Sequence, residues 1–411
     1  MFALKATYFF IFLLPVLLLP EAHAFGKPPA GSNSNQSGDL DIAVVLIDYP
    51  GAPDASLVPS ADFLNEVFVG TQGGVSVSDA FAKLSEGRVK FRNYKIFGPY
   101  HLQETIYCDQ EEKLWKLGVQ AVGADVNFDQ FSRVVYVMPR PTANSSCDYY
   151  GMIAAARADM ECTGVETLQG NRCITFAWIG WQSQMQGKDS TDHDRTLSKY
   201  YVTKLITHEM LHGWNLMHNN TYADDFHDVI PPVNHAESRL EFGDSYPIMS
   251  SAGTGRAMGW LTGAHLVRLG WLGVDEWSDV RENGTFDIAP LAYGQKGLKV
   301  LRIPRKKAGE SDPGDYLWIE YRKNLSAYDS VTFWPPNEYD SRHMGIVVHE
   351  TSKALADGET VLLKFNAPAA PDFLHSDYRL PPSWQDSYTG VRLEILSQTS
   401  EKARIRVTFG N

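Results

Sequence analysis

Three histidines and one glutamate close together in the chain have the residue types and spacing of a catalytic metal site. The stretch reads HEMLHGWNLMH, which places imidazoles at His208, His212 and His218 and a carboxylate at Glu209. On a helix, residues four positions apart lie on one face about one turn apart, so His208 and His212 can bind the same Zn²⁺ ion. Glu209 then lies beside the metal, where it can take a proton from a metal-bound water. Three histidine ligands leave one coordination position for that water, as in catalytic zinc sites.

The third histidine requires a sharp turn of the chain after the helix. His218 lies six residues beyond His212, and a continuous helix would carry it past the metal. Asn215 stands where the turn is needed, and after Gly, Asn is among the residues that best tolerate a left-handed backbone. We therefore predict His218 as the third ligand and Asn215 as the turn residue. Two alternatives stay open: a downstream glutamate, Glu237 or Glu241, as third ligand, or three ordinary histidines without a metal.

The elements that must position this motif mix strands and helices, which predicts an α+β fold class. A long helix beginning near residue 196 is expected to run into the motif. Predicted strands lie at residues 41–47, 89–96, 134–138 and 174–178, and predicted helices at residues 60–69, 78–86 and 110–122. After about residue 275 the chain consists of short strand-like runs divided by Gly, Pro and Asp. This pattern predicts a β-sandwich-like C-terminal domain.

The N-terminus has the features of a cleaved signal peptide. Lys5 precedes an apolar run at residues 8–19, and Ala22 and Ala24 are the small residues that signal peptidase reads. A signal anchor is the alternative, but the run is short for a bilayer. The predicted organisation is a signal peptide (1–24), a flexible linker (25–38), a catalytic domain (39–275) and a β-rich domain (276–411).

Cysteine usage agrees with an exported protein, and the net charge argues against nucleic acid as a partner. The four cysteines are Cys108, Cys147, Cys162 and Cys173, none in C-x-x-C spacing. In an oxidising compartment they predict two disulfides, with three pairings open. The net charge of -12 repels phosphate backbones, so nucleic acid is excluded as a partner. No segment after the signal peptide is apolar enough for a stable membrane anchor, and the oligomeric state is not specified by the sequence.

The motif resembles that of the metzincin zinc peptidases, H-E-x-x-H-x-x-[G/N]-x-x-H followed by a Met. Within that group the chain is most similar to the gametolysin family, through the EFGDSYPIMS stretch at residues 241–250, the LGWL stretch at 269–272 and the VSDAF stretch at 77–81. The resemblance implies a metzincin-like catalytic domain with a mixed sheet and an active-site helix. It also implies that Met249 forms a Met-turn, a hydrophobic floor beneath the ligands, and that an edge strand near residues 176–179 binds the substrate as an added strand.

These features together predict a secreted, extracellular or periplasmic zinc endopeptidase. By resemblance its substrates would be extracellular-matrix or cell-wall glycoproteins. The alternatives are a secreted adhesion or carbohydrate-binding protein with a degenerate peptidase domain, and another zinc hydrolase such as an amidase. Degenerate sites usually lose the general base or a ligand, whereas Glu209 and all three histidines are present.

Two further features contain residue types that bind metals, but ordinary structural roles are favoured for both. The oxygen-rich stretch from Asp189 to Asp194 is of a kind that binds Ca²⁺, but it lacks the spaced Gly and Glu of an EF-hand loop. A solvated loop at a helix start is favoured there. For His343 and His349 in the β-rich part, surface or packing roles are expected.

Overall fold

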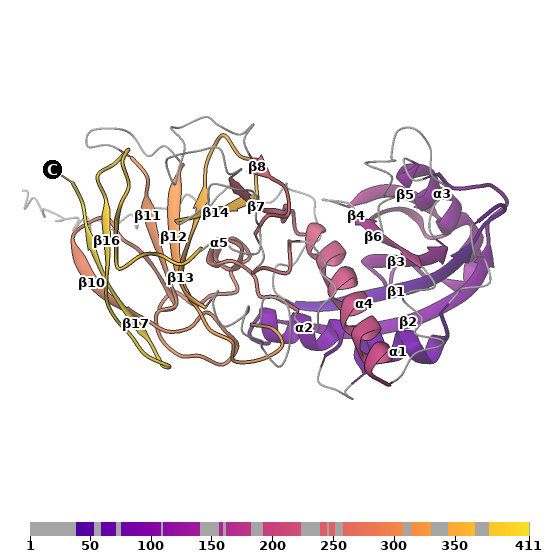
Figure 1. The fold of residues 1–411 in the computed structure, drawn as a ribbon. Coiled ribbons are helices and arrows are strands. Elements are labelled where there is room, and N and C mark those ends of the chain that lie inside the picture. Colours follow the sequence, from indigo (N-terminus) through magenta and orange to yellow (C-terminus); the bar gives the residue numbers. More distant parts are fainter. Residues whose placement is uncertain are drawn as a thin grey trace, which may run out of the picture.

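The computed structural model describes most of the chain from residue 38 onward. The described residues are 38–52, 59–70, 75–107, 110–139, 156–158, 162–181, 192–222, 239–244, 246–250, 258–306, 314–329, 344–365 and 378–410. The predicted signal peptide and nearly all of the linker lie outside them. Figure 1 shows two units side by side, a sheet with its helices and a pair of sheets. The α+β class is confirmed.

The first unit is a mixed sheet with the strand order β2-β1-β3-β6-β4 and with β5 paired to β6. The strands β1, β2, β3 and β6 run parallel, while β4 and β5 are antiparallel to β6. Their bounds are β1 (Gly38–Asp48), β2 (Val89–His101), β3 (Arg133–Pro139), β4 (Ala156–Ala158), β5 (Thr163–Thr167) and β6 (Gly170–Trp181). Both faces of β1 are buried: Ile42, Val44 and Leu46 belong to one core, whereas Ala43, Val45 and Ile47 belong to the other.

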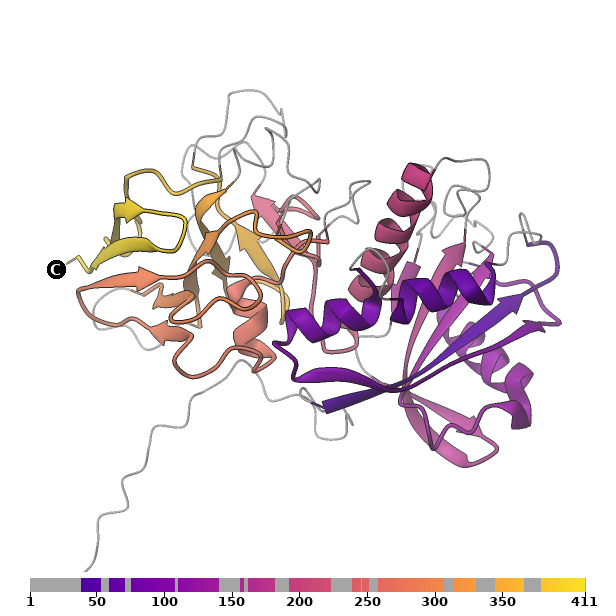
Figure 2. The same ribbon diagram turned by 90° about the horizontal axis from the view of Figure 1, so that it is seen from below.

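Helices cover both faces of this sheet (Figure 2). One core is shared with α1 (Ala61–Val69), α2 (Val77–Leu84) and α4 (Asp192–His212), and the opposite core with α3 (Glu111–Val122), which continues into the short helix η2 (Gly123–Asp125). The side chains of Ser60 and Ser76 accept hydrogen bonds from the backbone of the first turns of α1 and α2, which fixes where these helices begin.

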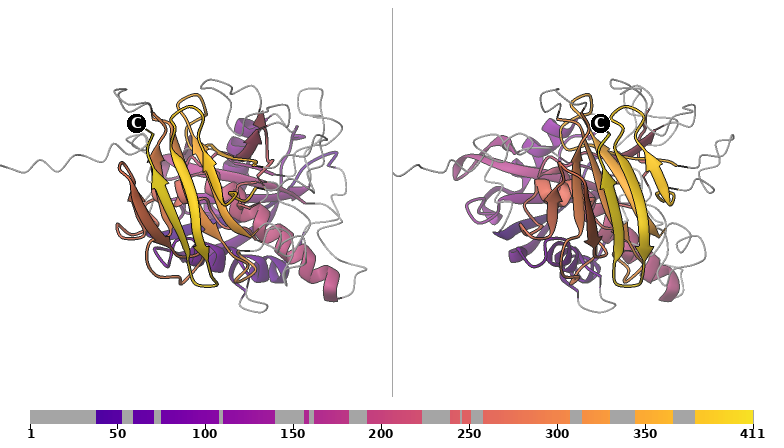
Figure 3. Two further views of the ribbon diagram at one scale, coloured as in Figure 1. Left: turned by 60° about the vertical axis from the view of Figure 1, so that its left-hand side comes forward. Right: turned by 90° about the vertical axis from the view of Figure 1, so that its left-hand side faces the viewer.

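The second unit consists of two sheets that share one core. A seven-stranded sheet has the order β8-β7-β14-β13-β12-β11-β9, and a four-stranded sheet has the order β10-β17-β16-β15. Apolar residues of both sheets, such as Leu301, Ile319, Leu393 and Ile405, form one cluster, and Figure 3 shows the yellow strands of the smaller sheet lying over the larger one. The bounds are β7 (Asn219–Tyr222), β8 (Arg239–Leu240), β9 (Trp277–Asp279), β10 (Gly284–Ile288), β11 (Val300–Pro304), β12 (Tyr316–Arg322), β13 (Gly345–Thr351), β14 (Thr360–Leu362), β15 (Ser383–Gln385), β16 (Arg392–Gln398) and β17 (Ala403–Thr408).

The larger sheet combines strands from both sides of residue 275. β7 directly follows the histidine motif and pairs in parallel with β14, while β8 pairs with β7. The short helix α5 (Gly263–Arg268) lies in the chain between β8 and β9. The segment that follows His218 is therefore built into the second unit.

The sequence expectation of an edge strand at residues 176–179 is wrong. These residues lie in β6, which is bonded to β3 on one side and, at Ala177–Ile179, to β4 on the other. The short antiparallel strand β4, which sequence patterns did not reveal, ends the sheet within the described residues.

A disulfide links the two sides of a hairpin in the first sheet. Cys162 and Cys173 form a disulfide across the β5–β6 hairpin, whereas Cys108 and Cys147 lie outside the described residues. Among the residues that the structure describes, no helix is long and apolar enough to cross a membrane.

Candidate metal centre

Helix α4 ends at His212, and the residues that follow pack closely against the first sheet. A Cβ atom on Gly213 would lie 2.5 Å from Cγ2 of Thr175 and would also overlap the guanidinium of Arg133, so only glycine fits. The Arg133 guanidinium stacks 4.0 Å from the ring centroid of Trp214. Asn215 then takes a left-handed conformation with φ 58°, and its N–H donates to the carbonyl of His212 over 2.7 Å. The chain thereby reverses and leads His218 back toward the helix.

The turn brings the three predicted ligands together. One nitrogen from each of His208, His212 and His218 lies within 4.8 Å of the others, so the cluster can hold a metal ion. The Nε2 atoms of His208 and His212 are 3.1 Å apart. Two nitrogens bound to one tetrahedral Zn²⁺ are separated by about 3.3 Å, as follows from Zn–N bonds of about 2.05 Å. The observed spacing therefore fits a shared ion.

Each histidine uses its other nitrogen in a hydrogen bond. Nδ1 of His208 lies 2.8 Å from the carbonyl oxygen of Ile248, and Nδ1 of His212 lies 2.7 Å from that of Leu216. A carbonyl only accepts, so both Nδ1 atoms carry the proton and both Nε2 atoms present a lone pair. Partners of this kind fix the orientation of metal-binding histidines.

The electrostatics of the cluster keep the imidazoles neutral. Burial, assisted by the neighbouring histidines, lowers the pKa of His208 well below its usual value and that of His212 to about 4. Burial also lowers the pKa of His218, although the carboxylate of Glu241 opposes this shift. Neutral imidazole is the form that binds metal, so near pH 7 the three histidines are in the protonation state that metal binding requires.

Glu209 lies on α4 directly after His208 and is only 6% exposed. A carboxylate is a residue type that can act as a general base for metal-bound water. The three-imidazole donor set suits zinc but also copper, iron and nickel, so the geometry establishes a candidate metal site without selecting the ion.

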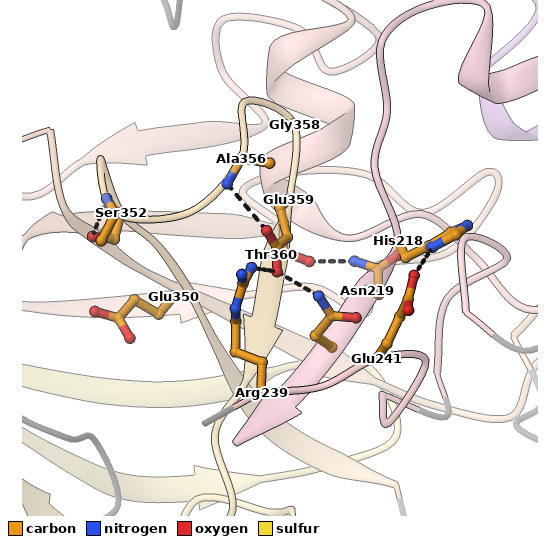
Figure 4. Close-up of polar contacts among 12 residues, drawn as sticks. His218, Asn219, Arg239, Glu241, Glu350, Ser352, Ala356, Gly358, Glu359 and Thr360 are labelled. Atoms are coloured by element: carbon orange, nitrogen blue, oxygen red, sulfur yellow. Dashed lines mark hydrogen bonds and ion pairs between the residues drawn. The ribbon is translucent and has the colours of Figure 1, made fainter. Parts of the chain in front are cut away.

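Two residues of the turn that follows β8, Glu241 and Phe242, contact the ring of His218. Glu241 accepts a hydrogen bond from Nδ1 of His218 at 2.7 Å, so the structure places this carboxylate behind His218 (Figure 4). The ring of Phe242 lies 4.0 Å, centroid to centroid, from that of His218, and its φ of 59° is left-handed. Asn220 Oδ1 accepts from the Phe242 N–H and Ser250 Oγ donates to its carbonyl, which holds this unusual backbone. The other alternative ligand, Glu237, lies outside the described residues.

Met249 is fully buried in the core that contains the apolar side of α4. Its neighbour Ile248 supplies the carbonyl that His208 binds, and its own carbonyl accepts from the N–H of Asn219 at 3.0 Å. The segment around Met249 thus contacts both the helix of the first two ligands and the strand after the third.

His349 has a buried structural role rather than a surface role, and its partners are charged rather than apolar. His349 on β13 is fully buried between two carboxylates, with Nε2 2.8 Å from Asp244 and Nδ1 2.5 Å from Glu320. Glu320 also accepts from the N–H of Gly263 at the start of α5 and lies 3.1 Å from Arg322. The cluster joins the segment before Met249 to the centre of the larger sheet. His343 lies outside the described residues.

We predict that this cluster makes stability fall at alkaline pH. Burial alone lowers the pKa of His349, but the charges of Glu320 and Asp244 outweigh it and raise the pKa to about 9. The folded protein therefore holds a proton that an unfolded histidine, with a pKa near 6.5, releases earlier. The stabilisation is complete below about pH 6.5 and is lost as the pH rises through about 9, with a total of roughly 3 kcal/mol.

The measurement is the free energy of urea unfolding between pH 6 and 9.5. The wild type should lose stability over this range relative to His349→Gln, whose curve should be flatter. Parallel curves for the two proteins would contradict the assignment of a charged His349.

Among the residues that the structure describes, no other candidate from the sequence joins the metal cluster. Of the oxygen-rich stretch, residues 189–191 lie outside the described part and the side chains of residues 192–194 are not described, so the calcium hypothesis stays untested. The disulfide Cys162–Cys173 belongs to the β5–β6 hairpin.

Comparison of the sequence with protein-family models and with curated proteins gives no match. The functional assignment therefore rests on the residues of the site and their geometry. The contacts that sequence reasoning missed, those of Phe242 and His349, come from residues far from the motif in the chain.

Proposed function

We propose that the protein is a zinc-dependent endopeptidase. The observation that carries the proposal is the convergence of three neutral imidazoles, with Nδ1 of His208 and His212 engaged by carbonyls and that of His218 by a carboxylate, beside a buried Glu209. Three histidines with an open position are the donor set of catalytic rather than structural zinc sites. The resemblance of the motif to the metzincins, and within them to the gametolysin family, supports zinc and peptide hydrolysis.

In the proposed mechanism the side chains of the site orient the imidazoles and transfer the protons needed to hydrolyse the amide bond. When bound, zinc supplies a Lewis acid that acidifies water and polarises a carbonyl. Glu209 accepts a proton from the attacking water and later delivers it to the leaving amine. Ile248, Leu216 and Glu241 fix the three imidazole rings, so that little reorganisation is needed during the reaction. Met249 forms the apolar floor of the site in this proposal.

The substrate is proposed to be an extended segment of an extracellular or cell-wall protein. β4 packs beside α4 and is the last strand of its sheet within the described residues, so its outer side is where a substrate strand could add. This replaces β6 as the expected binding strand. Secretion is proposed from the N-terminal sequence pattern, and the Cys162–Cys173 disulfide is compatible with an oxidising compartment.

The test is to recover the exported chain, measure its metal content and follow casein cleavage with and without a chelator. One zinc per chain with cleavage that stops on chelation and returns with zinc is expected. Zinc without cleavage of casein or of a broad peptide library would contradict an endopeptidase of general specificity. A chain without zinc after purification in zinc-containing buffer would contradict the metal site itself.

A further inference from the structure

The two units of the fold each contribute part of the ligand set. His208 and His212 belong to α4, which packs on the first sheet. His218 directly precedes β7, a strand of the seven-stranded sheet. The position of the third imidazole relative to the other two therefore depends on how the second unit meets the end of α4.

That meeting point is the loop between β13 and β14. The carbonyl of Gly358 accepts from the N–H of Met217 at 3.0 Å and from Nε2 of His265 at 2.9 Å. The carboxylate of Asp357 accepts from the side-chain amide of Asn215 at 3.3 Å. The loop thus binds the turn that lies between the second and third histidines. Asn215 and Asp357, which are in contact, are 142 residues apart in the chain.

The loop is itself held rigidly in place. Arg268 of α5 binds Asp357 with both guanidinium nitrogens, at 2.6 and 2.8 Å, a geometry that fixes direction as well as distance. Gly358 has a φ of 83°, and a Cβ atom there would overlap the carbonyl oxygen of Asn215. Close approach of the two backbones therefore requires glycine at this position.

The chain beyond His218 is anchored by the same segment. Thr360 pairs with Asn219 in the β7–β14 ladder, and their side chains are hydrogen-bonded. The buried carboxylate of Glu359 accepts from the side chain of Asn220. It also accepts from the side chain of Arg239 (Figure 4). Residues on both sides of His218 are thus bound to residues 357–360.

We propose that the Asp357–Gly358 loop is a positioning element of the metal centre, which holds the Asn215–Met217 turn so that His218 faces His208 and His212. This inference rests on the proposed metal-binding function. It assigns the second unit a role in building the site. The loop supplies none of the three converging ligands, so it acts through the third of them.

The test uses Co²⁺, which substitutes for Zn²⁺ and whose visible absorption reports the coordination geometry. Gly358→Ala should weaken Co²⁺ binding by roughly 10- to 100-fold, as expected for loss of an outer partner of a ligand, and should reduce the intensity of the tetrahedral bands. Asp357→Ala removes the Asn215 and Arg268 contacts from a half-exposed position and should act in the same direction with a smaller effect.

The matched control is Gly390→Ala. Gly390 is also left-handed, with φ 73°, but an added Cβ would meet its nearest neighbour at an ordinary 3.4 Å, in the loop before β16. It should share the backbone strain and leave the Co²⁺ affinity and spectrum unchanged. Thermal unfolding of the metal-free proteins separates a general loss of stability from a change in the site.

Weaker binding and altered bands in Gly358→Ala and Asp357→Ala, but not in Gly390→Ala, would support the inference. Wild-type affinity and spectrum in folded Gly358→Ala would overturn it, as would an equal effect in Gly390→Ala. If Gly358→Ala does not fold, Asp357→Ala decides in the same way. A wild-type chain that binds neither Co²⁺ nor Zn²⁺ would instead contradict the proposed function.

Discussion

Replacing Glu209 by Gln is expected to lower kcat/KM for peptide hydrolysis by roughly 10²- to 10⁴-fold, the usual contribution of a general acid–base group. Gln has nearly the same shape but does not accept the proton of the attacking water. Because Glu209 is not one of the three converging ligands, the zinc content should stay at the wild-type level. The measurements are steady-state kinetics on a fluorogenic peptide and metal analysis of the same sample.

A matched variant separates chemistry from packing. Glu209→Asp keeps the carboxylate but withdraws it by one methylene, so activity should lie between the wild type and Glu209→Gln. Loss of zinc in Glu209→Gln would show that this residue supports the metal rather than the proton transfer. Wild-type kinetics with zinc bound would remove Glu209 from the mechanism.

The ligand spacing and the turn after α4 could be predicted from the sequence, because both depend only on residues close together in the chain. The spacing of His208 and His212 follows from the period of one helix, and the helix α4 ends at His212. The need for a turn before His218 follows from counting residues, and Asn215 has the left-handed φ that such a turn uses. Strand β1 and helices α1, α2 and α3 likewise follow from apolar periodicity and serine caps or acidic first turns.

The support of the site depends on pairings between distant residues, which one sequence does not reveal. The residue type of Glu241 allows it to be a metal ligand, and only the pairing of β7 with β8 places it behind Nδ1 of His218. The sequence does not reveal the charged partners of His349, because Asp244 lies 105 residues earlier in the chain. The family resemblance implies an edge strand at residues 176–179, but β4 pairs with β6 there, and a strand of three residues is too short to show a sequence pattern.

The identity of the third ligand is decided by comparing His218→Ala with Glu241→Gln. His218→Ala leaves two imidazoles and should lower the zinc affinity by more than about 100-fold, since a ligand outweighs its outer partner. Glu241→Gln keeps an oxygen near Nδ1 but loses the charge that stabilises His218, so affinity should fall by roughly 10- to 100-fold with zinc still bound at saturation. Competition with a chromophoric chelator measures both.

The double variant tests whether Glu241 acts only through His218. If it does, adding Glu241→Gln to His218→Ala should change the zinc affinity little, because the effects of residues in one chain of contacts do not add. The opposite ranking, with zinc lost in Glu241→Gln and retained in His218→Ala, would make Glu241 the ligand. The present geometry argues against that ranking, because His218 belongs to the converging set of three histidines, while Glu241 lies against its Nδ1.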